Sequence, residues 1–223
     1  MSMAAVGIAS YLLGSVPFSI ILGRLWKGID VREHGSRNAG VTNVYRVAGI
    51  LPATAVLILD AAKGAAAVLL VTRISLDPVP ISPIDLRLLA GILVIAGHVF
   101  PIFANFRGGK GIATGLGALV CIIPLEVALA LILFVLIVAT TRYVSLGSLS
   151  ATTLVLVALM LEKCYLGRDV PTTLLIAVFF LTAFIFFNHR SNIKRLLQGS
   201  ENKFGRRKVK PDTKDARQPE VRS

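Results

Sequence analysis

The sequence predicts an all-α integral membrane protein with about seven transmembrane helices, some of them short or broken, and with polar loops that face the cytoplasm. Three observations lead to this fold class. The 223 residues are 55% hydrophobic, and their mean hydropathy is +0.75. Only 16% of the residues are charged, where a soluble domain has roughly a quarter. The charged residues also cluster between apolar runs that are long enough to cross a bilayer.

The basic net charge of +12 indicates an anionic partner. Because the rest of the chain is apolar, we expect membrane lipid headgroups to be this partner, and we expect no nucleic acid. The two cysteines, Cys121 and Cys164, lie within or at the end of apolar runs and indicate neither a disulfide framework nor a metal site. The sequence shows no cluster of metal-ligating residues, so we predict neither a metal nor a cofactor.

The first two predicted spans are Met3 to Leu25 and Ile50 to Thr72. Pro17 predicts a kink in the first, because proline lacks the N–H that a helix interior requires. Asp60 and Lys63 lie three residues apart near the middle of the second span and therefore on one helical face. Ionisable groups at that depth usually face the bundle interior and support function, although a purely structural ion pair is an equal alternative.

A connector from Arg73 to Arg87 leads to the third predicted span, Leu88 to Phe106. The next apolar run, Ile112 to Thr141, would form a single helix of about 45 Å, which is too long for the bilayer without strong tilt. If this run crossed once, the basic C-terminal tail would lie outside, against the positive-inside rule. We therefore predict that it breaks at Pro124 into two short or partly re-entrant helices.

The last two predicted spans are Tyr143 to Leu161 and Pro171 to Asn188. Residues 1–197 then form the membrane domain. Residues 198–223 are basic and lack apolar periodicity, which predicts a disordered cytoplasmic tail near anionic lipid. With the basic loops inside, the N-terminus lies outside and the C-terminus in the cytoplasm.

Four polar patches converge on the cytoplasmic face in this topology: residues 32–46, 107–111, 142–148 and 189–195. Their glycines can turn backbone N–H groups toward an anion, and their arginines and lysines suit phosphate. We interpret them as a cationic pocket at the mouth of a helical bundle, whose apolar walls would admit a lipid chain. The alternative is that they are only topology signals.

The motifs GSRNAGVTNVYR, GHVFPIF with FRGGKGIATG, RYVSLGS and HRSNIKRLL resemble those of the bacterial acyl-phosphate:glycerol-3-phosphate acyltransferases, the PlsY family. The resemblance covers residues 5–200. It implies a seven-helix inner-membrane enzyme that acylates the 1-hydroxyl of glycerol 3-phosphate from a fatty acyl phosphate. The products would be lysophosphatidic acid and phosphate, in the first step of bacterial phospholipid synthesis.

The chain departs from the usual family loop at Arg37, Ala39 and Val41, where glycine, proline and alanine are usual. The change at Arg37 matters most, because a residue with a Cβ resists a left-handed backbone.

The resemblance and the residue chemistry together give a set of expected site residues. The expected catalytic residues, which would orient substrate or relay a proton, are Ser36, His98 and Asn192. The sequence leaves open whether His98 is a base or an orienting group. The expected substrate and phosphate contacts are Gly35, Asn38, Gly40, Thr42, Asn43, Arg46, Gly108, Gly109, Lys110, Gly111, Arg142 and Ser145. The expected supporting residues are Asp60, Lys63 and His189.

An acyl phosphate is already activated, so direct attack by the glycerol hydroxyl needs no enzyme nucleophile, and positioning with electrostatic stabilisation would dominate catalysis. The fifth residue after each histidine is Ala39, Phe103 or Lys194. The His-x-x-x-x-Asp pair of acyltransferases that use thioesters is therefore absent, which argues against coenzyme A as donor. A soluble enzyme that makes the acyl phosphate is a further candidate partner.

A transporter or channel for a phosphorylated or anionic solute is the alternative function. Broken helices and a midplane Asp–Lys pair would suit a transporter. However, the sequence shows no clear internal repeat, and its polar residues cluster at one face.

Overall fold

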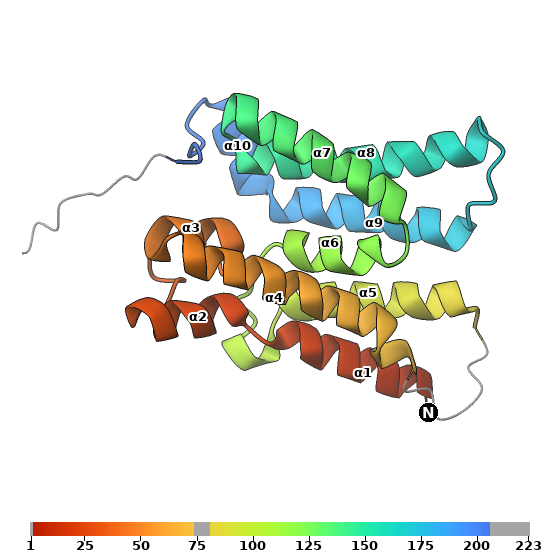
Figure 1. The fold of residues 1–223 in the computed structure, drawn as a ribbon, viewed down its shortest axis with the longest axis horizontal. Helices are drawn as coiled ribbons and strands as arrows, with labels where there is room; N and C mark the ends of the chain where they lie inside the picture. The colour runs from red at the N-terminus through yellow and green to blue at the C-terminus, as the bar shows by residue number, and fades with distance from the viewer. Residues whose placement is uncertain (1, 74–80, 206–223) are drawn as a thin grey trace, which may run out of the picture.

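The computed structural model describes residues 2–73 and 81–205, and within these ranges all regular structure is helical. The elements follow one another as α1 (Ser2–Ser15), α2 (Phe18–Lys27), α3 (Val41–Ala48), α4 (Ile50–Leu69), η1 (Val71–Arg73), α5 (Pro83–Val99), η2 (Ile102–Ala104), α6 (Ile112–Val120), α7 (Pro124–Thr141), α8 (Val144–Cys164), α9 (Thr172–Asn188) and α10 (Arg190–Leu197). The long helices run roughly side by side, with α1, α2 and α4 on one side of the bundle and α7, α8 and α9 on the other (Figure 1).

Five helical segments in the described ranges are long and apolar enough to cross a membrane. The bent pair α9 and α10, whose axes differ by 61°, makes a sixth. The short α6 lies between the two sides of the bundle and accounts for the remaining predicted segment (Figure 1). With nine residues it is only about 14 Å long, so it cannot cross a bilayer alone. The prediction of about seven segments, some of them short, therefore agrees with the structure.

The structure interrupts the helix at both predicted sites, at Pro17, where a kink was predicted, and at Pro124, where a break was predicted. The first span divides at Pro17 into α1 and α2, and the run from 112 to 141 divides into α6 and α7. Pro124 occupies the first turn of α7, where its missing N–H has no partner to lose. The break reverses the chain, so the turn before α6 and the start of α8 lie at the same end of the bundle (Figure 1).

One predicted boundary is wrong. The third span begins at Pro83 rather than at Leu88. Ser82 caps this helix, since its Oγ accepts a hydrogen bond from the N–H of Asp85 at 3.2 Å, and Pro83 fits the first turn. The capping signal was present in the sequence, but the apolar run starts only later. Residues 74–80 of the predicted connector lie outside the described residues.

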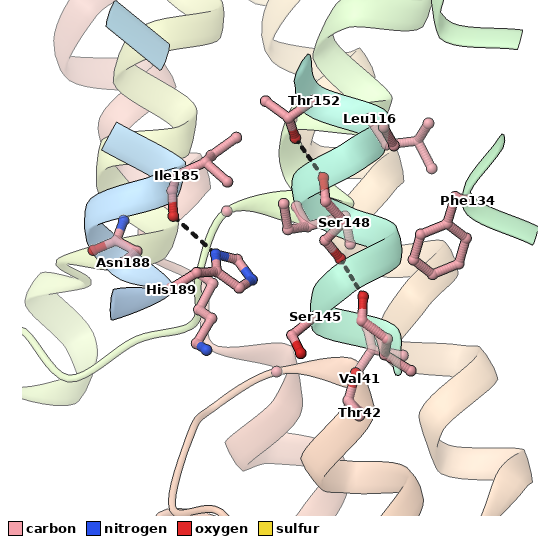
Figure 2. Close-up of a pocket in the computed structure, with 18 of the residues that line it drawn as sticks. Val41, Thr42, Leu116, Phe134, Ser145, Ser148, Thr152, Ile185, Asn188 and His189 are labelled. Carbon is pink, nitrogen blue, oxygen red and sulfur yellow. Dashed lines mark hydrogen bonds between the residues drawn. The ribbon is translucent and has the colours of Figure 1, made fainter. Parts of the chain in front are cut away.

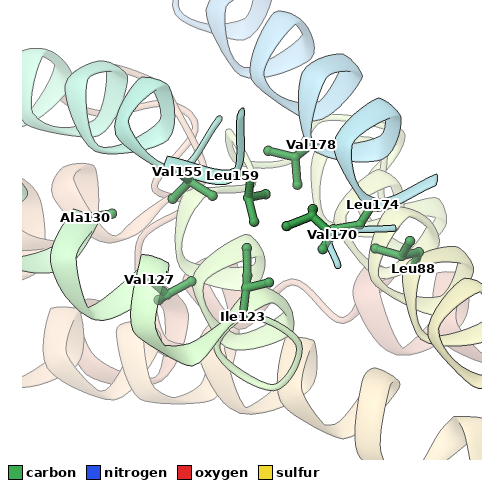
Figure 3. Close-up of a cluster of buried hydrophobic side chains, with 9 residues drawn as sticks. All are labelled: Leu88, Ile123, Val127, Ala130, Val155, Leu159, Val170, Leu174 and Val178. Carbon is green, nitrogen blue, oxygen red and sulfur yellow. The ribbon is translucent and has the colours of Figure 1, made fainter. Parts of the chain in front are cut away.

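The largest of the buried apolar clusters packs helices of both sides of the bundle against one another (Figure 3). It joins α5, α7, α8, α9 and the turns before α7 and α9, through Leu88, Ile123, Val127, Ala130, Val155, Leu159, Val170, Leu174 and Val178. These helices cannot separate here without losing the close packing of the cluster.

Two helix pairs approach closely through glycine. A Cβ at Gly97 of α5 would overlap the carbonyl of Tyr11 in α1, and one at Gly64 of α4 would overlap the carbonyl of Thr114 in α6. Small residues at such contacts let helix backbones touch, which is how membrane helices gain packing energy. The contact between α4 and α6 fixes the short helix whose N-terminus carries the second polar patch.

Candidate active site

A cavity of about 730 Å³ opens among the polar patches at one end of the bundle. Its polar lining comes from the loop before α3 and α3 itself, the turn before α6, the start of α8 and the junction of α9 with α10. The four predicted patches therefore meet at one cavity. The predicted site residues that line it are Ser36, Asn38, Gly40, Thr42, Asn43, Arg46, Asp60, His98, Lys110, Gly111, Ser145, His189 and Asn192.

The other five predicted site residues lie outside this lining. Lys63, Gly108 and Gly109 line a neighbouring space of about 10 Å³. Gly35 takes a left-handed backbone with φ +61°. Arg142 ends α7 with φ 64°, and its carbonyl accepts a hydrogen bond from the N–H of Phe204 at 2.7 Å. The structure therefore does not bring these five residues to the cavity lining with the other predicted site residues.

The N-terminal loop, residues 30–40, is held together by Asn43. The Nδ2 of Asn43 donates hydrogen bonds to the carbonyls of Val31 at 2.7 Å and His34 at 3.0 Å, and its Oδ1 accepts one from the N–H of Ser36 at 2.7 Å. Because these bonds occupy the amide, Asn43 organises the loop instead of making the predicted phosphate contact. Gly35 belongs to the same arrangement, since a Cβ there would overlap Asn43 Oδ1.

Arg37 adopts the left-handed conformation that its Cβ disfavours, with φ 60°. Its N–H donates a hydrogen bond to the carbonyl of His34 at 3.0 Å and closes a turn. A non-glycine residue in this conformation costs roughly 1–2 kcal/mol. The loop therefore keeps its shape at Arg37 at an energetic cost that glycine would avoid.

The glycine turn, residues 107–111, is held by its own backbone. The N–H groups of Gly108 and Gly109 donate to the carbonyls of Val99 and His98, both at 3.1 Å. A Cβ at Gly109 would overlap both His98 Nε2 and the carbonyl oxygen of Ala39, so this glycine is enclosed between the turn and the N-terminal loop. The turn then leads into the N-terminus of α6, whose N-cap, Gly111, lines the cavity. Helix N-termini favour anions.

The cavity mouth is cationic. Burial lowers the pKa of Lys110 to about 8, and the neighbouring Arg195 contributes to this shift. Burial also lowers the pKa of Arg46 from its usual value. Lys110 donates a hydrogen bond to Asn192 Oδ1, so α10 and the glycine turn meet at this lysine. Cations held close together in a partly buried site bind phosphate strongly, because phosphate relieves their mutual repulsion.

His189 follows α9, and its ring projects toward α8 and Ser145 (Figure 2). Its Nδ1 lies 2.8 Å from the carbonyl oxygen of Ile185. Because a carbonyl oxygen only accepts, Nδ1 must carry a proton, and the Nε2 of the neutral ring is left as an acceptor. This arrangement suits contact with a substrate hydroxyl. The sequence placed His189 only in a supporting role.

Sequence reasoning missed Glu201, which belongs to the stretch interpreted as a disordered tail. Its Oε1 accepts hydrogen bonds from Ser145 Oγ at 3.1 Å and from Asn192 Nδ2 at 2.7 Å. Its Oε2 pairs with Arg195 Nε at 2.6 Å. Glu201 therefore joins α8 to α10 beside the cationic mouth. Nothing in the composition of a polar, charged tail indicates which of its residues makes such a contact. Residues 206–223 of the predicted tail lie outside the described residues.

The deeper part of the cavity is apolar. Hydroxyl groups on α8 do not change this, because Ser148 Oγ and Thr152 Oγ1 donate to the carbonyls of Val144 and Ser148 in their own helix, at 3.0 and 2.8 Å (Figure 2). The apolar lining consists of Leu116, Leu119, Val127, Ala130, Leu131, Phe134, Val155, Val178 and Leu181. One cavity thus combines a phosphate-compatible mouth with walls that suit an alkyl chain.

Comparison with known proteins gives consistent matches along nearly the whole chain. The family model described as glycerol-3-phosphate acyltransferase matches residues 4–199. The glycerol-3-phosphate acyltransferase of Halalkalibacterium halodurans is 43% identical over 204 residues, which cover 90% of this chain and 95% of that protein. The enzyme of the same name from Clostridioides difficile is 40% identical and covers 93% of this chain and 98% of its own length.

Solved structures show the same architecture. The crystal structure of PlsY (YgiH), described as an integral membrane glycerol 3-phosphate acyltransferase in its glycerol 3-phosphate form, aligns with a TM-score of 0.81 and 34% identity. The match covers 92% of this chain and 96% of that one. The lysophosphatidic acid form aligns with a TM-score of 0.79 over the same shares. At this identity and coverage, the arrangement of helices around the cavity is that of an integral membrane protein.

Proposed function

Because this chain belongs to the glycerol-3-phosphate acyltransferase family, we propose that it transfers a fatty acyl group from acyl phosphate to the 1-hydroxyl of glycerol 3-phosphate. The products are lysophosphatidic acid and phosphate. The observation that carries this proposal is the single cavity with a cationic mouth and apolar walls. The relatives act on glycerol 3-phosphate by name, and the solved structures are described with glycerol 3-phosphate and with lysophosphatidic acid.

The reaction needs one bond to form and one to break. The glycerol oxygen attacks the acyl carbon, the bond between the acyl carbon and the bridging phosphate oxygen breaks, and phosphate leaves with the electron pair. Two phosphate groups must be held side by side during this step. Arg46, Lys110 and the N-terminus of α6 supply positive charge at the cavity mouth for both. Holding the reactants and stabilising developing charge are then the main catalytic contributions.

The proton of the attacking hydroxyl has two acceptors. One is a phosphate oxygen of a substrate. The other is His189 Nε2, which is free to accept because Nδ1 is bonded to Ile185. His98 suits this task less well, because its Nδ1 faces Asp60 at 3.5 Å and its Nε2 lies against Gly109.

The function also implies a location. We place the protein in the inner membrane of a bacterium, with the polar end of the bundle and the C-terminus in the cytoplasm and the N-terminus outside. Glycerol 3-phosphate and a soluble enzyme that makes acyl phosphate would then reach the cavity mouth directly. Labelling of a cysteine introduced at Leu146 from each side of intact cells tests this orientation, since selective labelling from outside would contradict it.

The test of the activity is reconstitution. The purified protein in lipid should convert palmitoyl phosphate and labelled glycerol 3-phosphate into labelled lysophosphatidic acid and release one phosphate per product. Palmitoyl coenzyme A in place of palmitoyl phosphate should give no product, and product from it alone would show that the proposed donor is wrong. Uptake of labelled glycerol 3-phosphate into sealed vesicles, without any lipid product, would instead favour the transporter.

A further inference from the structure

A buried polar cluster lies beside the contact between the N-terminal loop and the glycine turn. It consists of Asp60 and Lys63 from α4 and His98 from the last turn of α5. Lys63 Nζ lies 2.8 Å from Asp60 Oδ1, and both side chains are 2% exposed. His98 Nδ1 lies 3.5 Å from the same carboxylate oxygen. The predicted Asp–Lys pair is therefore present, and the structure adds a histidine to it.

Lys63 is also anchored to the backbone that joins α1 to α2. Its Nζ donates hydrogen bonds to the carbonyls of Gly14 at 2.9 Å and Val16 at 3.0 Å. These carbonyls lie at the end of α1, where Pro17 interrupts the helix and leaves acceptors without helical partners. The lysine is thus fixed in place, and it fixes the Asp60 carboxylate in turn.

His98 connects this anchored carboxylate to the glycine turn. One ring nitrogen, Nδ1, faces Asp60, and the other, Nε2, lies against Gly109 so closely that a Cβ there would overlap it. The same Cβ would overlap the carbonyl oxygen of Ala39 in the N-terminal loop. A change in the orientation of the His98 ring would therefore change its contact with Gly109, the neighbour of Lys110.

We propose that Asp60 is a positioning residue for the reaction: held by Lys63, it orients the His98 ring, and that ring supports the glycine turn so that Lys110 faces the substrate phosphate. The inference rests on the proposed function for its assay. It gives His98 an orienting role in place of the role of a base. A buried ion pair alone would be a poor explanation for these residues, because apolar side chains usually stabilise a protein as well as a buried pair does.

The experiment separates stability from positioning. Asp60→Asn and Lys63→Met each leave one buried charge without its partner, so both single variants should lose folded yield and melt at lower temperature. Asp60→Leu with Lys63→Met removes both charges at similar volume and should restore the yield. Its kcat/KM for glycerol 3-phosphate should nevertheless stay about ten- to a hundredfold below wild type, as expected when a reacting group is misplaced by a fraction of an ångström or more.

Two further variants test whether Asp60 acts through His98. Asp60→Asn with Lys63→Met keeps an acceptor for Nδ1 and should recover part of the activity that the Leu–Met variant loses. Adding His98→Gln to the Leu–Met variant should lower kcat/KM little further, because the two changes interrupt the same support. The matched control is Glu162→Gln with Arg168→Met, which removes an ion pair of 3.3 Å outside the cavity lining and should leave kcat/KM near wild type.

Each outcome decides the proposal. Full activity in the well-folded Leu–Met variant would make the pair purely structural and overturn it. A further large loss on adding His98→Gln would show that the two residues act independently, which also overturns it. The proposed function is decided separately by whether the wild type makes lysophosphatidic acid. If the wild type makes no product, the variants can instead be compared with it by the rise in Tm that glycerol 3-phosphate induces in each.

Discussion

The two loops that meet at the cavity mouth are built by different means. The N-terminal loop is held by side chains: Asn43 bonds to its backbone at three points, and Arg32 pairs with Asp30 at 2.7 Å and donates to the carbonyl of Ala104 at 2.8 Å. This pairing lowers the pKa of Asp30 well below its usual range. The glycine turn is held by backbone hydrogen bonds and by the absence of side chains at Gly108 and Gly109.

This difference predicts different responses to substitution. A loop held by side chains can lose one contact and keep the others, so damage should be graded. A turn enclosed by its neighbours cannot accept even one extra carbon without moving them, so damage should be abrupt. The predictions below test this comparison, from the largest expected effect to the smallest.

The largest effect is expected for Gly109→Ala. Its Cβ would overlap His98 Nε2 and the carbonyl of Ala39, so the two loops must separate. We expect kcat/KM to fall at least about a hundredfold, since a displacement of about 1 Å can cost that much. Gly91→Ala in α5 is the control, because its new Cβ would meet its nearest neighbour at 3.7 Å. Steady-state kinetics measures both variants. Equal, small losses of kcat/KM in the two would show that the turn is not enclosed.

Asn43→Ala should have a graded effect on the other loop. It removes the acceptor for the N–H of Ser36 and the donor for two carbonyls, and Asn43 is 1% exposed. Leaving buried groups unpaired costs about 1–3 kcal/mol. We expect a lower Tm together with a rise in the KM for glycerol 3-phosphate, but residual activity above that of Gly109→Ala. An unchanged Tm would show that Asn43 does not hold the loop.

Much of this arrangement follows from local sequence signals. Pro17 predicted a kink and Pro124 a break, because proline disrupts a helix interior, and the spacing of Asp60 and Lys63 predicted one face. Glycines marked the turn before α6. These signals act within a few residues, so they are visible in the chain itself.

The rest depends on contacts between distant segments. Glu201 pairs with side chains of α8 and α10, and Phe204 stacks on Tyr45 with ring centroids 4.5 Å apart. The interpretation of the stretch after 197 as disordered used composition, which does not reveal a single carboxylate that meets a cationic site. The contact of His98 with Asp60 likewise depends on how α5 packs against α4.

Removing the cations at the mouth should have an intermediate effect. A charge-assisted contact with phosphate is worth about 1.5–3 kcal/mol, so Lys110→Ala should lower kcat/KM at least about tenfold. Arg46→Lys should also be costly, because a point charge cannot reproduce a bidentate fork. Both variants should stay folded in detergent, as judged by Tm. Kinetics close to wild type in Lys110→Ala would place the glycine turn outside the active site.

The same lysine predicts a pH dependence. Burial lowers the pKa of Lys110 to about 8, so its positive charge is present at pH 7 and mostly lost at pH 9. Glycerol 3-phosphate has completed its second ionisation, near pH 6, over this range. Since the pH dependence of kcat/KM reflects ionisations of the free enzyme, kcat/KM should fall roughly tenfold between pH 7 and pH 9. Lys110→Arg stays protonated and should flatten this profile; an equal fall in that variant would assign the ionisation to another group.

The smallest effect concerns Arg37, where the N-terminal loop tolerates what the glycine turn cannot. Its backbone is left-handed, with φ 60°, but its side chain is exposed, so the Cβ costs conformational energy without forcing neighbours apart. Arg37→Ala removes the guanidinium and keeps the Cβ, whereas Arg37→Gly removes both. We expect the glycine variant to be more stable than the alanine variant by up to about 1 kcal/mol, because the flexibility of glycine in the unfolded chain offsets part of the relief. Unfolding of both variants in the same detergent measures this difference, and the kcat/KM of Arg37→Ala measures the guanidinium separately. If Arg37→Gly were no more stable than Arg37→Ala, the backbone would accept a Cβ at this position without strain. The contrast with Gly109 would then depend only on the close neighbours that enclose Gly109.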